Sequence, residues 1–385
     1  MSISSAEKTV IAALAESGDA MLELLRRLVN IDSGSYDKAG VDAVQAVLRD
    51  HLAATGISAK VHPDETYGNC MTALVKAADG SDARPVMLMG HCDTVFGKGT
   101  VAQRPFRIDG HLAYGPGVAD MKGGLVINTF VLETLARFGA PVPLVALYTA
   151  DEEIASPSSR KVIEATARNA RAVFNGEPGR PTGNIVTGRK GAWFFDFEVT
   201  GKPAHSGVNH REGVSAIEAL CRKVVDLHSL TDYDVGTTVN VGKISGGTTV
   251  NTVAERARAS VDVRYATLDS MKAARGKVHA IVERKELEGS SARIVGEGDF
   301  LPLTQSPQSK MLFDAYARAA VDLGFEVQGE FTGGSADSGF TAAAGIATLC
   351  GMGPVGGKPH TPEEWLDIRT IVPRAQAIAL TIMRM

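Results

Sequence analysis

The chain has 385 residues, more than a single hydrophobic core usually supports, so two domains are expected. A formal net charge of -4 gives no electrostatic reason to expect a nucleic-acid partner. Apolar residues make up 44% of the composition, but no run approaches 18 consecutive apolar residues, and no basic segment followed by an apolar one opens the chain. We therefore expect an α/β protein that neither spans a membrane nor is secreted.

The spacing of the four cysteines matches neither a redox motif nor a zinc-binding motif. Cys70, Cys92, Cys221 and Cys350 lie in apolar or strand-like segments, and no Cys-x-x-Cys occurs. This predicts reduced thiols and a cytoplasmic location.

Helices alternate with apolar strands in the first half of the chain and again near its end. This alternation predicts a mainly parallel sheet flanked by helices, whose ligands gather at the carboxyl ends of the strands. The expected helices are 6–30 (broken at Ser17-Gly18), 41–52, 125–138, 308–323 and 369 to the end, and the expected strands are 59–61, 71–75, 86–91, 142–149, 171–174 and 347–350.

A different pattern occupies the middle of the chain. Trp193, Phe195, Phe197 and Val199 alternate with more polar residues, which indicates a half-buried strand. A helix at 213–230, strands at 237–244 and 255–265, a helix at 268–287 and a strand at 292–295 follow, in the β-α-β-β-α-β order of a ferredoxin-like α+β domain. We expect residues 188–300 to form an inserted domain, between catalytic segments 1–187 and 301–385.

The strand at 86–91 ends in His91, with Asp93 two residues later. Residues i and i+2 of an extended chain point to the same side, so His91 could bind a cation while Asp93 orients its imidazole. Taken alone, the pair is more often a capped loop.

Further acids follow other turns and strands. Asp120 lies in a glycine-rich turn before a helix, where an N-cap is the simpler interpretation. Asp151, Glu152 and Glu153 end an apolar strand, and Glu177 follows another. Adjacent carboxylates repel one another unless a cation is present, although a surface turn could tolerate them.

Six segments carry a family resemblance that extends over nearly the whole chain. They are Gly90-His-Cys-Asp-Thr-Val95, Tyr114-Gly-Pro-Gly-Val-Ala-Asp-Met-Lys-Gly-Gly124, Asp151-Glu-Glu153, Gly176-Glu-Pro178, Gly201-Lys-Pro-Ala-His-Ser206 and Lys358-Pro-His360. With these segments the sequence resembles the M20 clan of co-catalytic zinc peptidases and deacylases, most closely its glutamate carboxypeptidase branch.

The resemblance implies a site for two zinc ions. Asp120 would bridge them, with His91 and Glu177 on one ion and Glu153 and His360 on the other. Two divalent cations would nearly neutralise the three carboxylates, and Co²⁺ or Mn²⁺ could replace zinc. Glu152 resembles the general base, adjoining a ligand but pointing away from the metals.

The resemblance also assigns substrate contacts to the inserted domain. His205 is similar to a histidine that donates to the developing oxyanion, in several members from a neighbouring subunit, so a homodimer through this domain is expected. Asn251 and Arg264 resemble groups that hold the substrate carboxylate, and Gly334 belongs to a substrate-facing glycine loop. A histidine in a polar turn and a surface arginine remain the simpler alternatives.

Two positions depart from the family pattern. Ala254 follows Asn251-Thr-Val where many members have proline, and Arg189-Lys190 stands where members differ. Selectivity for glutamate is therefore not carried over with the motifs.

We thus expect a zinc-dependent amidohydrolase that cleaves the amide between an acyl or aroyl group and an amino acid with a free carboxylate, glutamate being favoured. The substrate would be a small molecule. An aminoacylase acting on N-acetyl amino acids and a catalytically silent homologue that binds amino-acid derivatives are the alternatives.

Overall fold

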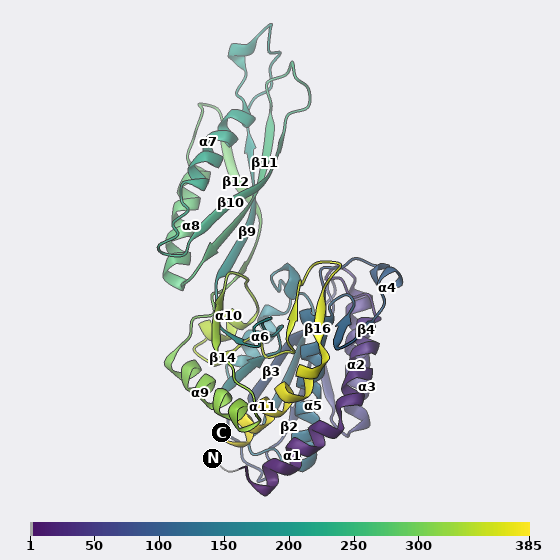
Figure 1. Cartoon of the computed structure of the whole chain (residues 1–385). Helices are drawn as coiled ribbons and strands as arrows, with labels where there is room; N and C mark the ends of the chain where they lie inside the picture. Colours follow the sequence, from purple (N-terminus) through teal and green to yellow (C-terminus); the bar gives the residue numbers. More distant parts are fainter. Residues whose placement is uncertain (1–2) are drawn as a thin grey trace. The chain divides into compact units, whose positions relative to one another are not determined.

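The structure, a computed structural model, describes residues 3–385 and divides into two compact units (Figure 1). The first unit comprises the chain up to Gly188 together with Leu303–Thr332 and Asp337–Met385. The second comprises Arg189–Pro302 and the short segment Gly333–Ala336. Among residues 3–385, no helix combines the length and apolarity that a membrane span requires.

A six-stranded sheet forms the centre of the first unit. Its neighbouring strands, in order, are β1 (Ala59–His62), β2 (Cys70–Val75), β6 (Leu144–Thr149), β3 (Val86–His91), β7 (Ala172–Asn175) and β14 (Ala347–Leu349). The strands from β6 to β14 pair in parallel, whereas β1 and β2 join by antiparallel pairing. The predicted mainly parallel sheet is confirmed. Every residue of β3 and β6 is buried, as expected of strands covered on both faces.

Helices from distant parts of the chain pack on this sheet. α5 contacts β3 and β6, and α1 and α11, from opposite ends of the chain, both pack against α5 (purple and yellow in Figure 1). Leu88, Leu125 and Ile378 belong to the shared core. The helices are α1 (Ser5–Glu16), α2 (Gly18–Val29), α3 (Lys38–Ala54), α4 (Thr100–Gln103), α5 (Gly123–Phe138), α6 (Arg160–Ala167), α9 (Pro307–Asp322), α10 (Ser338–Ala343) and α11 (Ile371–Met383).

The second unit is an antiparallel sheet with two helices on one face (Figure 1). Trp193, Phe197 and Val263 are buried in its core, and the intervening residues of β9 are less buried, as the alternation predicts. The β-α-β-β-α-β order is confirmed. In chain order the elements are β9 (Gly191–Thr200), α7 (Ala216–His228), β10 (Thr238–Gly246), β11 (Arg256–Tyr265), α8 (Leu268–Glu283) and β12 (Ser291–Phe300), with sheet order β10-β11-β9-β12.

Several short elements lie outside the two main sheets. They are too brief to show a periodic pattern, and most of their partners are distant in the sequence. One small sheet pairs β8 (Ile185–Arg189) with β13 (Gly329–Thr332), and another has the order β15 (Gly356–Gly357), β16 (Trp365–Asp367), β5 (Leu112–Tyr114) and β4 (Arg107–Asp109). Single turns of helix occur at η1 (Val118–Lys122), η2 (Glu152–Ile154), η3 (His210–Glu212) and η4 (Ile368–Thr370).

Candidate metal centre

His91 is the last residue of β3, and its imidazole is almost completely buried. Its Nδ1 donates to the backbone carbonyl of Asp93 at 3.0 Å and lies 3.3 Å from Asp93 Oδ1. A proton on Nδ1 leaves the lone pair on Nε2 of the neutral ring free to bind a cation.

The carboxylate of Asp93 is fully buried and organises the neighbouring loops. Oδ2 accepts hydrogen bonds from Ser35 Oγ at 2.6 Å and from the Glu153 N–H at 3.1 Å, while Oδ1 accepts from the Glu152 N–H at 3.1 Å. Asp93 therefore fixes both the ring of His91 and the start of the turn that carries the two glutamates.

Asp120 lies between two histidines that are far apart in the sequence. It belongs to η1, in a stretch with non-helical backbone angles just before α5. Oδ1 lies 3.2 Å from His91 Nε2, and Oδ2 lies 3.4 Å from His360 Nε2. Each carboxylate oxygen thus faces a different imidazole, which is the arrangement that a carboxylate bridging two cations requires.

The glutamates complete two groups around these residues. Glu153 Oε2 lies 3.1 Å from His360 Nε2, and Glu177 Oε1, just after β7, lies 3.6 Å from His91 Nε2. Potential ligand atoms of His91, Asp120 and Glu153 lie within 4.8 Å of one another, and so do those of His91, Glu152 and Glu177. The structure therefore brings all five residues predicted as metal ligands into one cluster.

Glu152 differs in orientation from the sequence expectation. Its Oε2 lies 3.9 Å from His91 Nε2, so the carboxylate faces the cluster instead of pointing away from it. Glu152 begins the short helix η2, and its backbone N–H is fixed by the hydrogen bond to Asp93 Oδ1.

The electrostatics of the cluster suit a cation. Burial, reinforced by Glu177, raises the pKa of Glu152 well above its usual range. Burial and the charge of Asp120 raise the pKa of Glu153 to about 7, and the hydrogen bonds with Asp120 and Glu153 raise the pKa of His360 to about 10. These acids ionise together only if positive charge is close by.

One carboxylate oxygen indicates whether the cluster suits a bound cation. Within residues 3–385, the buried Oε1 of Glu153 has no hydrogen-bond partner. A buried carboxylate oxygen without a partner is costly, and a bound cation would satisfy it. Imidazole and carboxylate groups are also the donors that zinc and its neighbours in the first transition series bind.

Glu364 was missed by the sequence analysis. Its buried carboxylate accepts hydrogen bonds from the backbone N–H groups of Gly117, Ala119 and Asp120, at 3.0, 2.8 and 2.9 Å. It therefore holds the glycine-rich turn that presents Asp120. The sequence offered only a weak signal, because the turn needs an acceptor for its N–H groups but many acids could supply it.

Asp337, at the end of the predicted glycine loop, is also buried. It accepts hydrogen bonds from Ser156 Oγ and Thr149 Oγ1, so it braces the chain around β6 within the first unit. The preceding residues Gly333–Ala336 belong to the second unit.

His205 and Asn251 lie in adjacent, exposed loops of the second unit. The N–H groups of Gly207 and Val208 donate to His205 Nδ1 at 3.1 and 3.3 Å, and the Ser206 N–H donates to the Asn251 carbonyl at 2.9 Å. Because Nδ1 accepts, the ring proton of neutral His205 is on Nε2, where it can be donated to a ligand.

Arg264 already has an anionic partner. Its Nε and Nη2 donate to the two carboxylate oxygens of Asp262 at 2.7 and 2.9 Å, and Nη1 donates to Ser335 Oγ at 3.1 Å. The carbonyl of the neighbouring Gly334 accepts from Arg189 Nη1 at 3.2 Å. A substrate carboxylate would therefore have to displace Asp262 from the guanidinium or share it.

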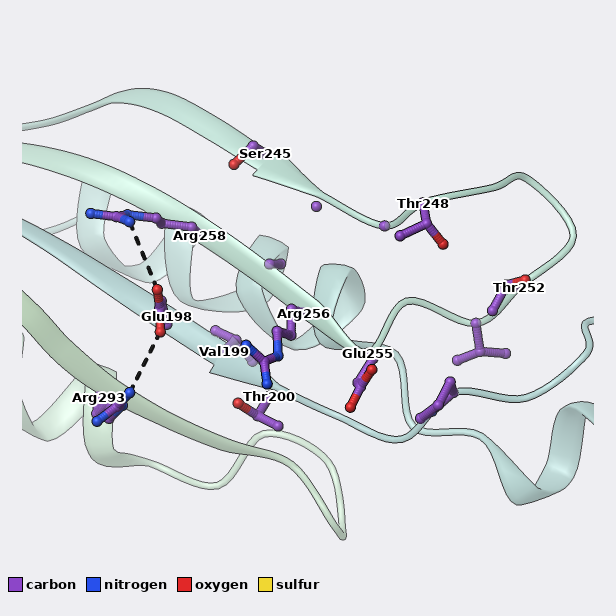
Figure 2. A pocket seen from close by; sticks show the side chains of 15 residues that line it. Glu198, Val199, Thr200, Ser245, Thr248, Thr252, Glu255, Arg256, Arg258 and Arg293 are labelled. Atoms are coloured by element: carbon purple, nitrogen blue, oxygen red, sulfur yellow. Dashed lines mark ion pairs between the residues drawn. The ribbon is translucent and has the colours of Figure 1, made fainter.

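The second unit also contains a hollow of its own, near the end of β9 and the start of β11. Figure 2 shows Glu198 between Arg258 and Arg293, with ion-pair distances of 3.8 and 3.7 Å, and Arg256 nearby. None of the residues predicted for substrate binding is among its described lining residues.

Comparison with known proteins identifies the family of the chain. Residues 87–384 match the description "Peptidase family M20/M25/M40". Carboxypeptidase G2 of Pseudomonas sp. (strain RS-16) is 28% identical over 98% of this chain and 92% of that protein, and a succinyl-diaminopimelate desuccinylase of Cupriavidus necator is 27% identical over 86% and 91%.

A solved structure extends the likeness to the fold. An M20 family metallo-carboxypeptidase from Sulfolobus solfataricus matches with a TM-score of 0.72 at 18% identity, covering 94% of this chain and 98% of that one. The chain belongs to peptidase family M20/M25/M40 and is a metal-dependent hydrolase.

Proposed function

We propose that the cluster holds two zinc ions and hydrolyses the amide between an acyl or aroyl group and an amino acid with a free carboxylate, glutamate being favoured. The observation that carries the proposal is the position of Asp120, with one oxygen facing His91 and the other facing His360. In the proposal His91 and Glu177 complete one metal site, and Glu153 and His360 complete the other. Cobalt or manganese could replace zinc at such donors.

The metal ions would supply Lewis acidity to the scissile carbonyl and to the attacking water. Glu152 would take the proton from that water and deliver it to the leaving nitrogen. Support for this role comes from the burial of Glu152 beside Glu177, which raises its pKa and so favours a carboxyl that can take up a proton.

Residues of the second unit would bind the rest of the substrate. We assign the Nε2–H of His205 to the oxyanion that develops on the carbonyl, because its Nδ1 is already engaged as an acceptor. Asn251, Arg264 and Gly334 would bind the free carboxylate, with Arg264 exchanging Asp262 for the substrate. Glutamate is favoured because the motifs resemble those of the glutamate carboxypeptidase branch.

A second function is favoured by a specific relative. The desuccinylase similarity supports an acylase that removes a small acyl group with the same cluster and the same Glu152. The two functions differ in the acyl group that fits, so a panel of substrates separates them.

We also propose that the protein is a homodimer through the second unit and resides in a reducing compartment, the cytoplasm. Ile217 and Val225 on α7 are 40% and 69% exposed, and Ile244 on the edge strand β10 is 61% exposed. A partner subunit on this side of the second unit would cover these apolar side chains and the strand edge. The cysteines are free thiols, which suits a reducing compartment. Sedimentation velocity of wild type and Ile244→Asp tests the dimer, and a wild-type monomer would disprove it.

The test of function uses protein stripped of metal and reloaded with zinc. Release of the amino acid is measured from N-benzoyl, N-acetyl and dipeptide substrates, for wild type and for Glu152→Ala. We expect the variant to keep its two zinc ions, measured by elemental analysis, and to lose about 10²- to 10⁴-fold in kcat. Full activity of Glu152→Ala would remove this residue from the mechanism, and inactivity of the zinc-loaded wild type on every substrate would refute the proposed function.

A further inference from the structure

A hollow of about 490 Å³ lies at the edge of the central sheet, wholly within the first unit. The edge strand β1 forms one side, and α6 with the residues just before it forms the other. The volume is within the range of about 300–1,000 Å³ that small-molecule sites occupy. None of the residues assigned to the metal cluster or to the substrate lines this hollow within the described chain.

Two lysines line the hollow against one acid. The lysines are Lys60 on β1 and Lys161 on α6, and the acid is Asp64. Oδ1 of Asp64 already accepts from the N–H groups of Thr66 and Tyr67, both at 2.9 Å. The lining therefore carries a net positive charge, and its acid is engaged by its own loop.

His62, the last residue of β1, also lines the hollow. Burial, followed by the positive charge of Lys60, holds the pKa of His62 below its usual value. Nε2 pairs with Thr72 Oγ1 at 2.9 Å, which fixes the orientation of the ring. An anion in the hollow would favour the charged imidazolium and would raise this pKa, so the occupied hollow could gain a third positive charge.

Ser158 supplies a separate observation that points to a ligand. It lines the hollow and is only 8% exposed, and within residues 3–385 its buried Oγ has no hydrogen-bond partner. A buried hydroxyl without a partner costs free energy, and an acceptor oxygen of a ligand would satisfy it. The N–H of Ser158 donates to Asp151 Oδ2 at 2.7 Å, which holds this residue in place.

We propose that this hollow binds a phosphate group, at a site separate from the metal cluster. A phosphate monoester has three terminal oxygens and a charge of about −1.5 to −2 at pH 7. Lys60, Lys161 and the Ser158 hydroxyl provide three donors for these oxygens. A carboxylate has two oxygens and one charge, so it would leave one donor unused. Val61 and Val162 line the same space and could cover a short organic part of the ligand.

Calorimetric titration of zinc-loaded protein with inorganic phosphate tests the site. Phosphate can also bind metal ions, so the assignment depends on variants of the hollow. Lys161→Met removes one charge-assisted hydrogen bond, and we expect it to weaken phosphate binding about tenfold or more. Lys272→Met, which changes another exposed helical lysine in the second unit, is the matched control and should bind phosphate like wild type. Equal affinity in all three proteins, or no binding to wild type, would refute the site.

Ser158→Ala tests the hydroxyl separately. Because this hydroxyl has no hydrogen-bond partner in the absence of a ligand, its removal should not lower the midpoint of thermal unfolding without phosphate. The same variant should weaken phosphate binding about tenfold. A lowered midpoint together with wild-type phosphate affinity would show that the hydroxyl has a structural role, and would overturn its assignment to the ligand.

The histidine gives a measurement that is confined to the hollow. In protein with ¹³C-labelled histidine, the NMR signal of His62 is identified by its absence from His62→Gln. Phosphate should raise the pKa of His62 in wild type and should raise it less in Lys161→Met. If phosphate leaves this pKa unchanged, any binding detected by calorimetry occurs elsewhere, and the proposal fails.

Two further probes identify the chemistry of the ligand. Acetate should bind the hollow about tenfold more weakly than phosphate, because one donor remains unused, and equal binding would overturn the preference for phosphate. Tighter binding of butyl phosphate than of inorganic phosphate would assign the site to a small phosphate ester. Equal affinities for the two would assign it to free phosphate.

Discussion

Replacing Glu364 by alanine should weaken both the fold and metal binding, although Glu364 is not one of the proposed ligands. The carboxylate is 1% exposed and accepts three backbone N–H groups from the turn that carries Asp120. Alanine would remove the carboxylate that accepts from all three of these N–H groups.

The size of the effect follows from these three donors. A buried donor without a partner costs about 1–3 kcal/mol, so three such donors would lower the free energy of unfolding by about 3–9 kcal/mol. Water entering the space left by the side chain would replace part of the lost bonding, which places the expected loss of unfolding free energy near the lower limit, about 3 kcal/mol. Asp120 would lose its alignment, and zinc affinity should fall about 10- to 100-fold.

Urea unfolding and competition with a zinc-binding dye measure the two quantities. Glu363→Ala is the matched control, because this neighbouring glutamate is exposed and pairs with Lys358 at the surface, where water screens the contact. Equal stability and equal zinc affinity in the two variants would show that the hydrogen bonds of Glu364 do not position Asp120.

Two further predictions concern pH and packing. Burial raises the pKa of Asp337 to about 7, so the folded protein binds more protons than the unfolded chain between about pH 4 and 7, and stability falls as pH rises through that window, by up to about 1.4 kcal/mol per unit. Asp337→Asn should remove this contribution to the slope in urea titrations of zinc-loaded protein; an unchanged slope would contradict the shift. Gly124→Ala would place a Cβ 1.7 Å from the Gly176 carbonyl oxygen, so we expect a loss of about 1–3 kcal/mol or more, whereas Gly276→Ala, in open space on a helix, should gain about 0.5–1 kcal/mol. Equal midpoints for the two alanine variants would refute the packing argument.

The parts of the fold that the sequence predicted are those with a periodic apolar pattern. β3 and β6 are continuous apolar runs buried along their whole length, and β9 alternates because helices cover one of its faces. The sheet order also explains why distant motifs meet. β6, β3 and β7 are parallel neighbours, so their carboxyl ends bring Glu153, His91 and Glu177 to one edge.

Residues whose role depends on tertiary contacts could not be identified from the sequence. Glu363 and Glu364 are adjacent and identical in type, yet the first is exposed and the second is buried against a turn more than 240 positions away in the chain. The difference arises from β16, a three-residue strand that pairs with β5 and was not predicted.

Backbone strain occurs in loops of the site that have no periodic sequence pattern. Among residues 3–385, the non-glycine residues with positive φ are Ala155, Ser156, Lys358 and His360, with φ of 70°, 53°, 54° and 63°. Such conformations cost about 1–3 kcal/mol each and persist only where other contacts enforce them.

Those contacts are present on both sides of the cluster. Ser156 donates through its N–H to the Asp151 carbonyl and through Oγ to Asp337, and Thr361 Oγ1 donates to the Lys358 carbonyl at 2.9 Å. Glycine at position 360 would relieve the strain but would lose the imidazole that faces Asp120. The strained backbone therefore lowers the stability of the protein but directs side chains toward the cluster. Loops of this kind have no periodic sequence pattern, so they are found from motifs, whereas helices and strands are found from periodicity.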